Sequence, residues 1–219
     1  MNERYYCFPD IHVRYDLLYK ALQFVYSENS NGGKIIFLGD YIDRGPMNKK
    51  VLETVMNPKE NWEFICLMGN HEEMFVDACD GKLLFYDPTV GLEFVPNANT
   101  QDDLRNGMPK AIVEWMRNLK LFHFEGNNVF AHAYYDDSIL PEHQTAADVL
   151  WARMDDFQSY TSQQNRLFLT HGHTPRKHGP LRAQNRVNLD AGAVFNGRYV
   201  IGEYKHGVRG PVDFHEFVE

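Results

Sequence analysis

The chain has 219 residues, 43% of them apolar, and a formal net charge of −8. This length suits one domain with an insertion, and the apolar fraction is sufficient for a substantial core. The acidic balance argues against electrostatic wrapping of nucleic acid, and it would repel a phosphorylated substrate unless cations sit in the site.

The first third of the chain alternates strand-like and helix-like segments. Short apolar runs predict strands at Arg4–Phe8, Lys34–Leu38 and Trp62–Leu67. Apolar residues at helical spacing predict helices at Asp16–Ser27, Met47–Met56 and His71–Cys79. Asp16 is the expected N-cap of the first helix. This β-α-β-α-β-α order predicts a mostly parallel sheet covered by helices.

The remaining two thirds of the chain open with a different composition. Residues 81–118 begin with glycine, proline and asparagine and then predict one amphipathic helix near 102–118, which we interpret as an inserted cap beside the core. A hairpin is expected from 120–125 and 128–133 around Gly126-Asn127, followed by a helix near 146–155. Short strands are expected at 166–170, 186–189, 198–204 and 212–217. This β-rich half predicts a second sheet stacked on the first.

The three cysteines, Cys7, Cys66 and Cys79, are odd in number and include no C-x-x-C pair. They therefore predict no disulfide framework and suit a reducing compartment, with Cys7 and Cys66 as inert core residues. The N-terminal residues form no apolar signal region, and no apolar run approaches the length that crosses a bilayer. We expect a cytoplasmic protein without membrane contact.

Polar residues gather where the predicted strands end, which is where open α/β sheets bind ligands. Five clusters share this position: Pro9–His12, Gly39–Pro46, Gly69–Glu73, Ala131–Ala133 and Thr170–Pro175. Each cluster alone is a weak signal, because a lone histidine at a strand end is more often structural and a lone aspartate often caps a helix. Together they are stronger, since all five carry Asp, Asn or His. Mixed oxygen and nitrogen ligands suit Mn²⁺, Fe²⁺ or Zn²⁺ better than Ca²⁺.

These five clusters resemble the motif set of the calcineurin-like metallophosphoesterases, and most closely its phosphoprotein phosphatase branch with the phage relatives typified by lambda phosphatase. The family pattern is G-D-x-H-G, G-D-x-x-D-R-G, G-N-H-E, a lone histidine in a strand, and G-H-T. The second, third and fifth motifs are matched fully, and the set spans residues 10 to 173. The resemblance implies an α/β fold: a sandwich of two mixed β-sheets flanked by α-helices, in a single domain over 1–219 with a small helical insertion at about 81–118.

The resemblance also implies a role for each matching residue. Two divalent ions, Mn²⁺ first with Fe²⁺, Zn²⁺ or Ni²⁺ as alternatives, would be held by Asp10, His12, Asp40, Asn70, His132 and His173, with Asp40 bridging both. His71 would be the general acid, with Asp43 as its partner. Phosphate oxygens would be bound by Arg44, Asn70 and Arg153, the last from a W-x-R segment at Trp151–Arg153. The implied reaction is hydrolysis of a phosphate monoester by a metal-bridging hydroxide.

The first motif departs from the family pattern on both sides. Pro9 precedes Asp10 and Val13 follows His12, where the family has glycine. Glycine there lets the backbone turn tightly past the metals, whereas proline fixes φ and removes an N–H donor. We expect the first ion to be held differently or less tightly. His171 is an additional histidine, for which a supporting role is expected rather than a role as a ligand.

The substrate is the least constrained part of the interpretation. The motif wording and the W-x-R segment favour a Ser/Thr protein phosphatase, with tyrosine phosphate as a further option, acting on a phosphorylated protein or small phosphoester. A symmetrical bis(5′-nucleosyl)-tetraphosphatase is the alternative. A nucleic-acid partner is not expected, because no basic aromatic groove is present. A non-catalytic metal-binding interaction module is a distant third, motivated by Pro9 and Val13.

Overall fold

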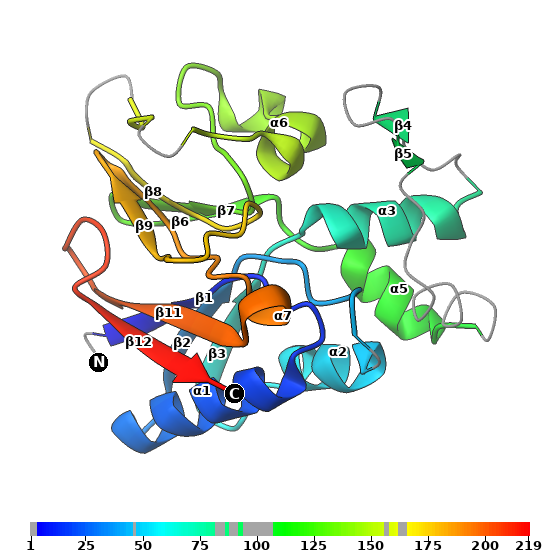
Figure 1. The fold of residues 1–219 in the computed structure, drawn as a ribbon, viewed down its shortest axis with the longest axis horizontal. Helices are drawn as coiled ribbons and strands as arrows, with labels where there is room; N and C mark the ends of the chain where they lie inside the picture. Colours follow the sequence, from blue (N-terminus) through cyan, green and yellow to red (C-terminus); the bar gives the residue numbers. More distant parts are fainter. Residues whose placement is uncertain are drawn as a thin grey trace.

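The computed structural model describes residues 4–45, 47–81, 86–87, 92–93, 107–155, 158–161 and 166–219. Two five-stranded sheets form its centre (Figure 1). A two-stranded pair, β4 (Tyr86–Asp87) and β5 (Leu92–Glu93), lies apart from them. The expected sandwich of two mixed sheets is thereby confirmed.

The first sheet has the strand order β12-β11-β1-β2-β3. Its strands are β1 (Arg4–Phe8), β2 (Gly33–Phe37), β3 (Trp62–Cys66), β11 (Arg198–Lys205) and β12 (Asp213–Val218). The first three are parallel, as the alternation of strands and helices predicts. We placed the last two strands in the second sheet, which is wrong: β11 pairs antiparallel with β1, and β12 with β11.

The second sheet has the strand order β6-β7-β8-β10-β9. Its strands are β6 (Phe122–Glu125), β7 (Asn128–Ala131), β8 (Phe168–His171), β9 (Leu181–Ala183) and β10 (Arg186–Asn188). The β6–β7 hairpin lies where the Gly126-Asn127 turn predicts it. The strand β9 was not predicted, because three residues are too few to give a periodic signal.

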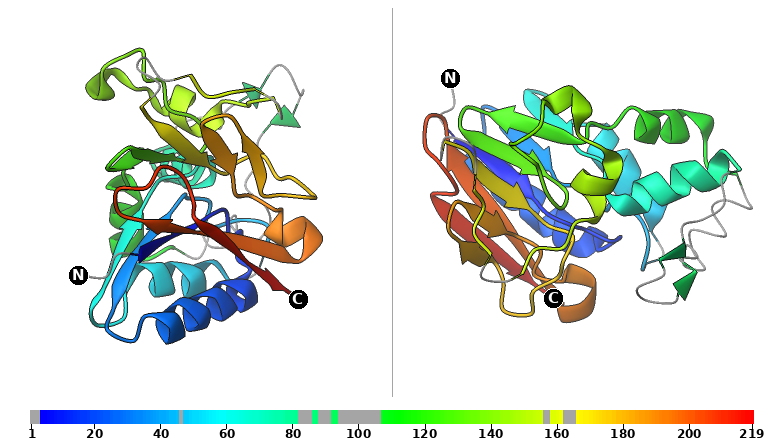
Figure 2. Two further views of the ribbon diagram at one scale, coloured as in Figure 1. Left: turned by 90° about the vertical axis from the view of Figure 1, so that its left-hand side faces the viewer. Right: turned by 90° about the horizontal axis from the view of Figure 1, so that it is seen from above.

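Helices flank the two sheets (Figure 1). Their bounds are α1 (Tyr15–Glu28), α2 (Asn48–Met56), α3 (Asn70–Cys79), α5 (Lys110–Arg117), η1 (Pro141–His143), α6 (Ala146–Trp151) and α7 (Ala193–Asn196). Helix α1 buries Leu17, Leu18, Ala21, Leu22 and Val25 against the first sheet. Figure 2 shows α3 and α5 extending beyond the same edge of the sheets.

Three helix predictions need correction. Asp16 is not the N-cap of α1, because the helix starts at Tyr15 and the Asp16 carboxylate instead accepts hydrogen bonds from Arg14. Helix α6 ends at Trp151 rather than near residue 155. The helix expected at 102–118 is shorter within the described residues, and residues 101–106 lie outside them. Ile112 and Met116 of α5 join the core of the first sheet.

Large apolar side chains from both sheets fill the space between them. Tyr5 and Cys7 of β1 pack with Phe130 of β7, Val187 of β10 and Tyr204 of β11. The carboxyl ends of the parallel strands in both sheets reach one edge of this shared core, where the polar clusters follow. Among the described residues, no helix is both long and apolar enough to span a bilayer.

Candidate metal centre

Six side chains predicted as ligands meet at the edge between the two sheets. All six belong to buried or nearly buried residues that follow β1, β2, β3, β7 and β8: Asp10, His12, Asp40, Asn70, His132 and His173. Two groups of donor atoms are present, and within each group the atoms lie within 4.8 Å of one another. One group comes from His12, Asp40 and His71, and the other from Asp10, Asp40 and His132. Asp40 belongs to both groups, which is the position a bridging carboxylate needs.

The first group is arranged around His12. Its Nδ1 lies 3.0 Å from the carbonyl oxygen of Ile42 and its Nε2 lies 3.3 Å from Oδ2 of Asp40. A hydrogen bond from Nδ1 to the carbonyl fixes the tautomer in which Nε2 carries a lone pair toward the cluster. Asp10 approaches from β1, and both its oxygens accept the backbone N–H of His173, at 3.2 and 3.1 Å.

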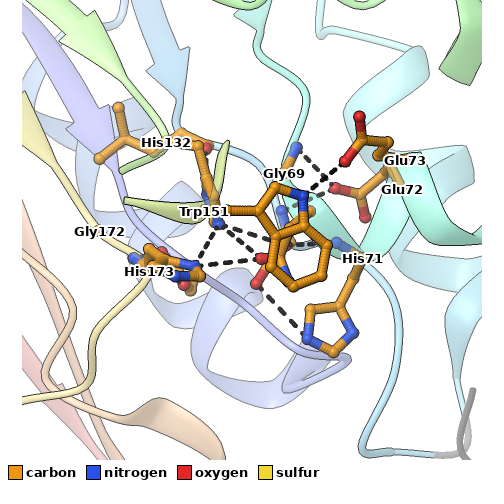
Figure 3. A network of polar contacts seen from close by, with 12 residues as sticks. Gly69, His71, Glu72, Glu73, His132, Trp151, Gly172 and His173 are labelled. Carbon is orange, nitrogen blue, oxygen red and sulfur yellow. Dashed lines mark hydrogen bonds and ion pairs between the residues drawn. The ribbon is translucent and has the colours of Figure 1, made fainter. Parts of the chain in front are cut away.

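The second group surrounds Nε2 of His132. This atom lies 3.0 Å from Oδ1 of Asn70, 3.2 Å from Nδ1 of His173 and 3.6 Å from Oδ1 of Asp40. His132 Nδ1 faces the carbonyl oxygen of Leu38 at 2.9 Å, which again directs Nε2 inward. Figure 3 shows His132 and His173 turned toward the same point, and the ring of Trp151 lies 6.5 Å from that of His173 between centroids.

The donor set fits divalent ions. Several lone pairs converge with few hydrogens to separate them, since three of the six donors are histidine nitrogens and two are carboxylates. Nε2 of His173 is also buried without a hydrogen-bond partner in the described part of the chain. A Cβ at Gly172 would meet Oδ1 of Asp10 at 2.0 Å, so the backbone approaches the carboxylate as closely as glycine permits. Nitrogen with carboxylate oxygen is the chemistry that Mn²⁺, Fe²⁺ and Zn²⁺ accept.

The electrostatics of the cluster also favour a bound cation. Burial, together with the nearby carboxylate of Asp190, raises the pKa of Asp10 well above its usual value. Burial and the charge of Glu72 do the same to the pKa of Asp40. Burial lowers the pKa of His12, with further contributions from His71 and Arg44. A metal ion binds neutral imidazole and ionised carboxylate. Its positive charge would therefore stabilise the ionised form of the carboxyls, which burial disfavours, and would bind the histidines in the neutral form that burial favours.

The carboxylate of Glu72 organises the loop that carries Asp40. It accepts hydrogen bonds from the backbone N–H groups of Asp40, Tyr41 and Ile42 at 2.8, 2.9 and 3.2 Å, and from that of Gly69 at 3.0 Å. Its side chain is fully buried. We assigned no role to Glu72 from the sequence, although it stands inside the G-N-H-E motif.

Replacing Glu72 by alanine is expected to destabilise the fold and to weaken metal binding together. Four buried N–H donors would lose their acceptor, at about 1–3 kcal/mol for each group left unsatisfied. A lower melting temperature and a lower affinity for Mn²⁺ in calorimetry would both follow. The Glu60→Ala variant, at an exposed glutamate, is the comparison, and an equally small effect of both variants would contradict this role for Glu72.

The predicted acid lies beside its predicted partner. His71 Nδ1 is 2.5 Å from Oδ2 of Asp43, and both side chains are buried. Burial raises the pKa of Asp43 to about 7. Arg44 is exposed, and its guanidinium lies 2.7 Å from His12 Nε2 and 3.4 Å from His71 Nε2.

Several residues of the centre adopt left-handed backbone angles that are unfavourable for side chains other than glycine. Their φ values are positive: His12 (42°), Val13 (67°), Asp40 (52°), Asp43 (71°), Arg44 (74°) and His173 (68°). Such conformations cost of order 1–3 kcal/mol each and concentrate at functional sites. The value at Val13 explains why the family pattern has glycine there, since a β-branched residue is a strong outlier in this region. Despite Val13 and Pro9, Asp10 and His12 reach the cluster.

The segment after Trp151 is held in place by hydrogen bonds at both ends. Trp151 Nε1 donates to Oε2 of Glu73 at 2.6 Å (Figure 3). Arg176 donates to the carbonyl of Met154 at 3.2 Å, and Arg186 to those of Asp155 and Gln158. Between these anchors the side chain of Arg153 is exposed. Its positive charge contributes to lowering the pKa of His173 to about 2, after burial and His132, which indicates that it lies near the cluster.

His171 is engaged away from the ligand cluster. Its Nε2 lies 3.0 Å from Nη1 of Arg186 and its Nδ1 lies 3.2 Å from the carbonyl of Gly172. Both ring nitrogens therefore have partners outside the ligand cluster, and the supporting role of His171 stays a prediction. The sequence did not indicate Arg186, because a fully buried arginine is recognisable only from its tertiary contacts.

Comparison with known proteins identifies the class that this fold and site define. The family model described as calcineurin-like phosphoesterase matches residues 4–202, and the chain belongs to that family. The bis(5′-nucleosyl)-tetraphosphatase PrpE [asymmetrical] of Anoxybacillus flavithermus is 27% identical over 219 residues, covering 86% of this chain and 84% of its own. The serine/threonine-protein phosphatase 2 of Salmonella typhimurium is 31% identical over 153 residues, covering 66% and 65%.

Solved structures share the fold at low sequence identity. A chain described as a diadenosine tetraphosphatase superposes with a TM-score of 0.69 at 15% identity, covering all of this chain and 94% of its own. A cold-active protein-tyrosine phosphatase from a psychrophilic Shewanella gives a TM-score of 0.63 at 15% identity, covering 93% and 80%. At these identities the likeness supports the fold alone.

Proposed function

We propose that the protein is a metal-dependent phosphatase that hydrolyses phosphate monoesters of proteins, on serine or threonine with tyrosine as a further option. The observation that carries this proposal is the pair of donor groups sharing Asp40, with an arginine and a hydrogen-bonded His–Asp pair beside them. Similarity to a serine/threonine phosphatase over two thirds of the chain supports the protein substrate.

Two divalent ions, Mn²⁺ by preference, would be held by the six residues of the cluster, with Asp40 shared. When bound they would supply positive charge to the phosphate and lower the pKa of the attacking water. Arg44 offers planar N–H donors that match phosphate oxygens, and Arg153 would add a second set from the anchored segment. The amide of Asn70 would add a further donor to the phosphate oxygens at the same edge of the sheets.

His71 would protonate the leaving oxygen. Burial and Arg44 lower the pKa of this imidazole. A dianionic phosphate bound beside it acts in the opposite direction, because a negative charge favours the protonated ring. Asp43 keeps the ring oriented through Nδ1, which directs Nε2 toward the side of Arg44 and Asp40.

Hydrolysis of dinucleoside tetraphosphates is the second candidate. The similarity to PrpE covers more of this chain than the similarity to the protein phosphatase does. That relative is described as asymmetrical, whereas the alternative considered from the sequence is a symmetrical enzyme. The same phosphate-binding residues would serve both reactions, so substrates must separate them.

Metal-stripped protein is expected to hydrolyse p-nitrophenyl phosphate only after Mn²⁺ is added, with a stoichiometry of two ions per chain in calorimetry. Phosphoserine peptide, phosphotyrosine peptide and diadenosine tetraphosphate, compared by kcat/KM, would then rank the candidate substrates. Fewer than two ions bound and no turnover with Mn²⁺, Fe²⁺, Zn²⁺ or Ni²⁺ would instead support a non-catalytic interaction module.

A further inference from the structure

The aromatic ring of Phe195 is exposed beside the metal centre. Of its surface, 62% is accessible, the largest fraction among the exposed large apolar side chains in the described ranges. The guanidinium carbon of Arg44 lies 5.0 Å from the centroid of this ring. Because Arg44 also reaches His12 and His71, the ring lies one side chain away from the proposed phosphate position. Leaving such a ring in water forgoes the free energy that its burial would release.

The short helix α7 holds Phe195 in a fixed position. The N–H of Gly192, which has a φ of 74°, donates to Oδ1 of Asp190 at 2.8 Å. Asn196 Nδ2 donates to the carbonyl of Ala191 at 2.8 Å, and Arg14 Nη1 donates to that of Ala193 at 2.9 Å. Arg14 is the residue after Val13, so the turn that follows His12 is tied to this helix. A ring on an anchored helix loses little entropy when a ligand packs on it.

We propose that Phe195 is a stacking platform for an aromatic group of the substrate, carried next to the phosphate that Arg44 binds. This proposal rests on the proposed function, because it uses the phosphate position assigned there. Arg44 contacts the ring through a cation–π interaction, and the exposed remainder of the ring is free to receive a second flat group. The shared chemistry is an aromatic ring, supplied by the phenol of phosphotyrosine or by a nucleobase.

The proposal narrows the substrates proposed above, because it favours the tyrosine option and the dinucleoside tetraphosphate candidate over serine and threonine phosphates. The alkyl side chains of phosphoserine and phosphothreonine carry no ring to place on Phe195. Tyrosine phosphate and nucleoside phosphates do, at different distances from phosphorus: the phenol is bonded to the ester oxygen, whereas a base is separated from it by a ribose. Phenyl and nucleoside ligands therefore distinguish the two sources.

Calorimetry on the Mn²⁺-loaded protein tests the platform with ligands that are not turned over. In the parent protein, phenylphosphonate is expected to bind about fivefold to tenfold more tightly than methylphosphonate, the scale of one aromatic contact. The ratio should fall close to one in Phe195→Ala and recover in Phe195→Trp. Leu140→Ala, at another side chain that is 57% exposed, should keep the parent ratio. The 5′-phosphonate analogues of AMP and of ribose 5-phosphate, which have no ester bond to hydrolyse, give the nucleobase arm.

Several outcomes would overturn the proposal that Phe195 is a stacking platform. A ratio near one in the parent for both ligand pairs would show that no ring packs there. Equal weakening of phenylphosphonate and methylphosphonate by Phe195→Ala would show that Phe195 only positions Arg44. Melting temperatures identify a variant that fails to fold, in which case Phe195→Leu, which keeps an apolar side chain, takes its place. Absence of turnover in the parent would count against the proposed function while leaving this binding ratio measurable.

Discussion

Replacing Asp40 by asparagine is expected to reduce Mn²⁺-dependent hydrolysis of p-nitrophenyl phosphate by more than about a hundredfold. Loss of a residue that merely orients a metal ligand already costs 10–100-fold, and Asp40 is the carboxylate shared by both donor groups. In the parent, the backbone N–H of His71 donates to Oδ1 of Asp40 at 3.1 Å. Asparagine keeps an oxygen that can accept this hydrogen bond, so the loop that carries residue 40 should keep its conformation. Initial rates at saturating Mn²⁺, with bound metal counted, measure the effect.

The same variant is expected to be more stable than the parent when both are metal-free at pH 7. The pKa of Asp40 is raised in the folded state, so the folded chain holds a proton that the unfolded chain releases above pH 4. The free energy of unfolding of the parent therefore falls as pH rises through that range, and the asparagine variant escapes part of this loss. The gain should appear as a higher melting temperature of the variant in chelator at pH 7.

Asp16 provides a control of opposite sign. A side-chain hydrogen bond with Arg14 lowers the pKa of this half-exposed carboxyl, so its ionised form stabilises the folded state above the unfolded pKa. Asp16→Asn should therefore lower the melting temperature slightly in chelator at pH 7, while Asp40→Asn raises it. Full activity of Asp40→Asn would contradict the shared-carboxylate assignment, and a melting temperature below that of the parent without metal would contradict the raised pKa of Asp40.

His71→Asn is expected to distinguish substrates by their leaving groups. Removing a general acid costs about 10²–10⁴-fold when the leaving oxygen needs a proton. We expect a loss of that size on an alkyl phosphate and a loss of less than about tenfold on p-nitrophenyl phosphate, whose leaving group is already acidic. The kcat/KM values of both esters, at matched metal content, give the comparison.

Asp43→Asn completes the comparison. It removes the carboxylate that lies 2.5 Å from His71 Nδ1 and keeps the imidazole. The loss of kcat/KM should again be larger on the alkyl phosphate than on p-nitrophenyl phosphate, but smaller than in His71→Asn. Equal losses on both esters in His71→Asn would remove His71 from the acid role and leave it as a structural or ligating residue. The latter is conceivable geometrically, because His71 belongs to the donor group of His12 and Asp40.

Elements set by local sequence were predicted closely. The strand Arg4–Phe8 is reproduced without change, and the helix from Met47 begins one residue later, at Asn48. The pairing of β11 with β1 could not be read from the sequence, because it joins residues about 200 positions apart and depends on which sheet offers an open edge. The apolar run Tyr199–Ile201 would suit a buried strand in either sheet.

The sequence motifs predicted the residues of the candidate site, but they did not predict the buried residues that hold the surrounding loops in place. The structure brings the six proposed ligands together, while their roles remain predictions. Glu72 and Arg186 were overlooked because a buried charge has meaning only through the groups it contacts, here backbone N–H groups and carbonyls from other segments. Phe195 was overlooked because an exposed aromatic residue is ordinary until its neighbour is known to be Arg44.

The hydrogen bonds between Asp10 and His173 join residues 163 positions apart in the chain. An ion held by Asp40 with Asn70, His132 and His173 would likewise close loops of up to about 130 residues. Bringing the ends of such a loop together costs the unfolded chain conformational entropy. The metal centre would then act as a reversible cross-link between the two sheets. Chelation should increase proteolysis throughout the chain rather than only at the loops that carry the ligands.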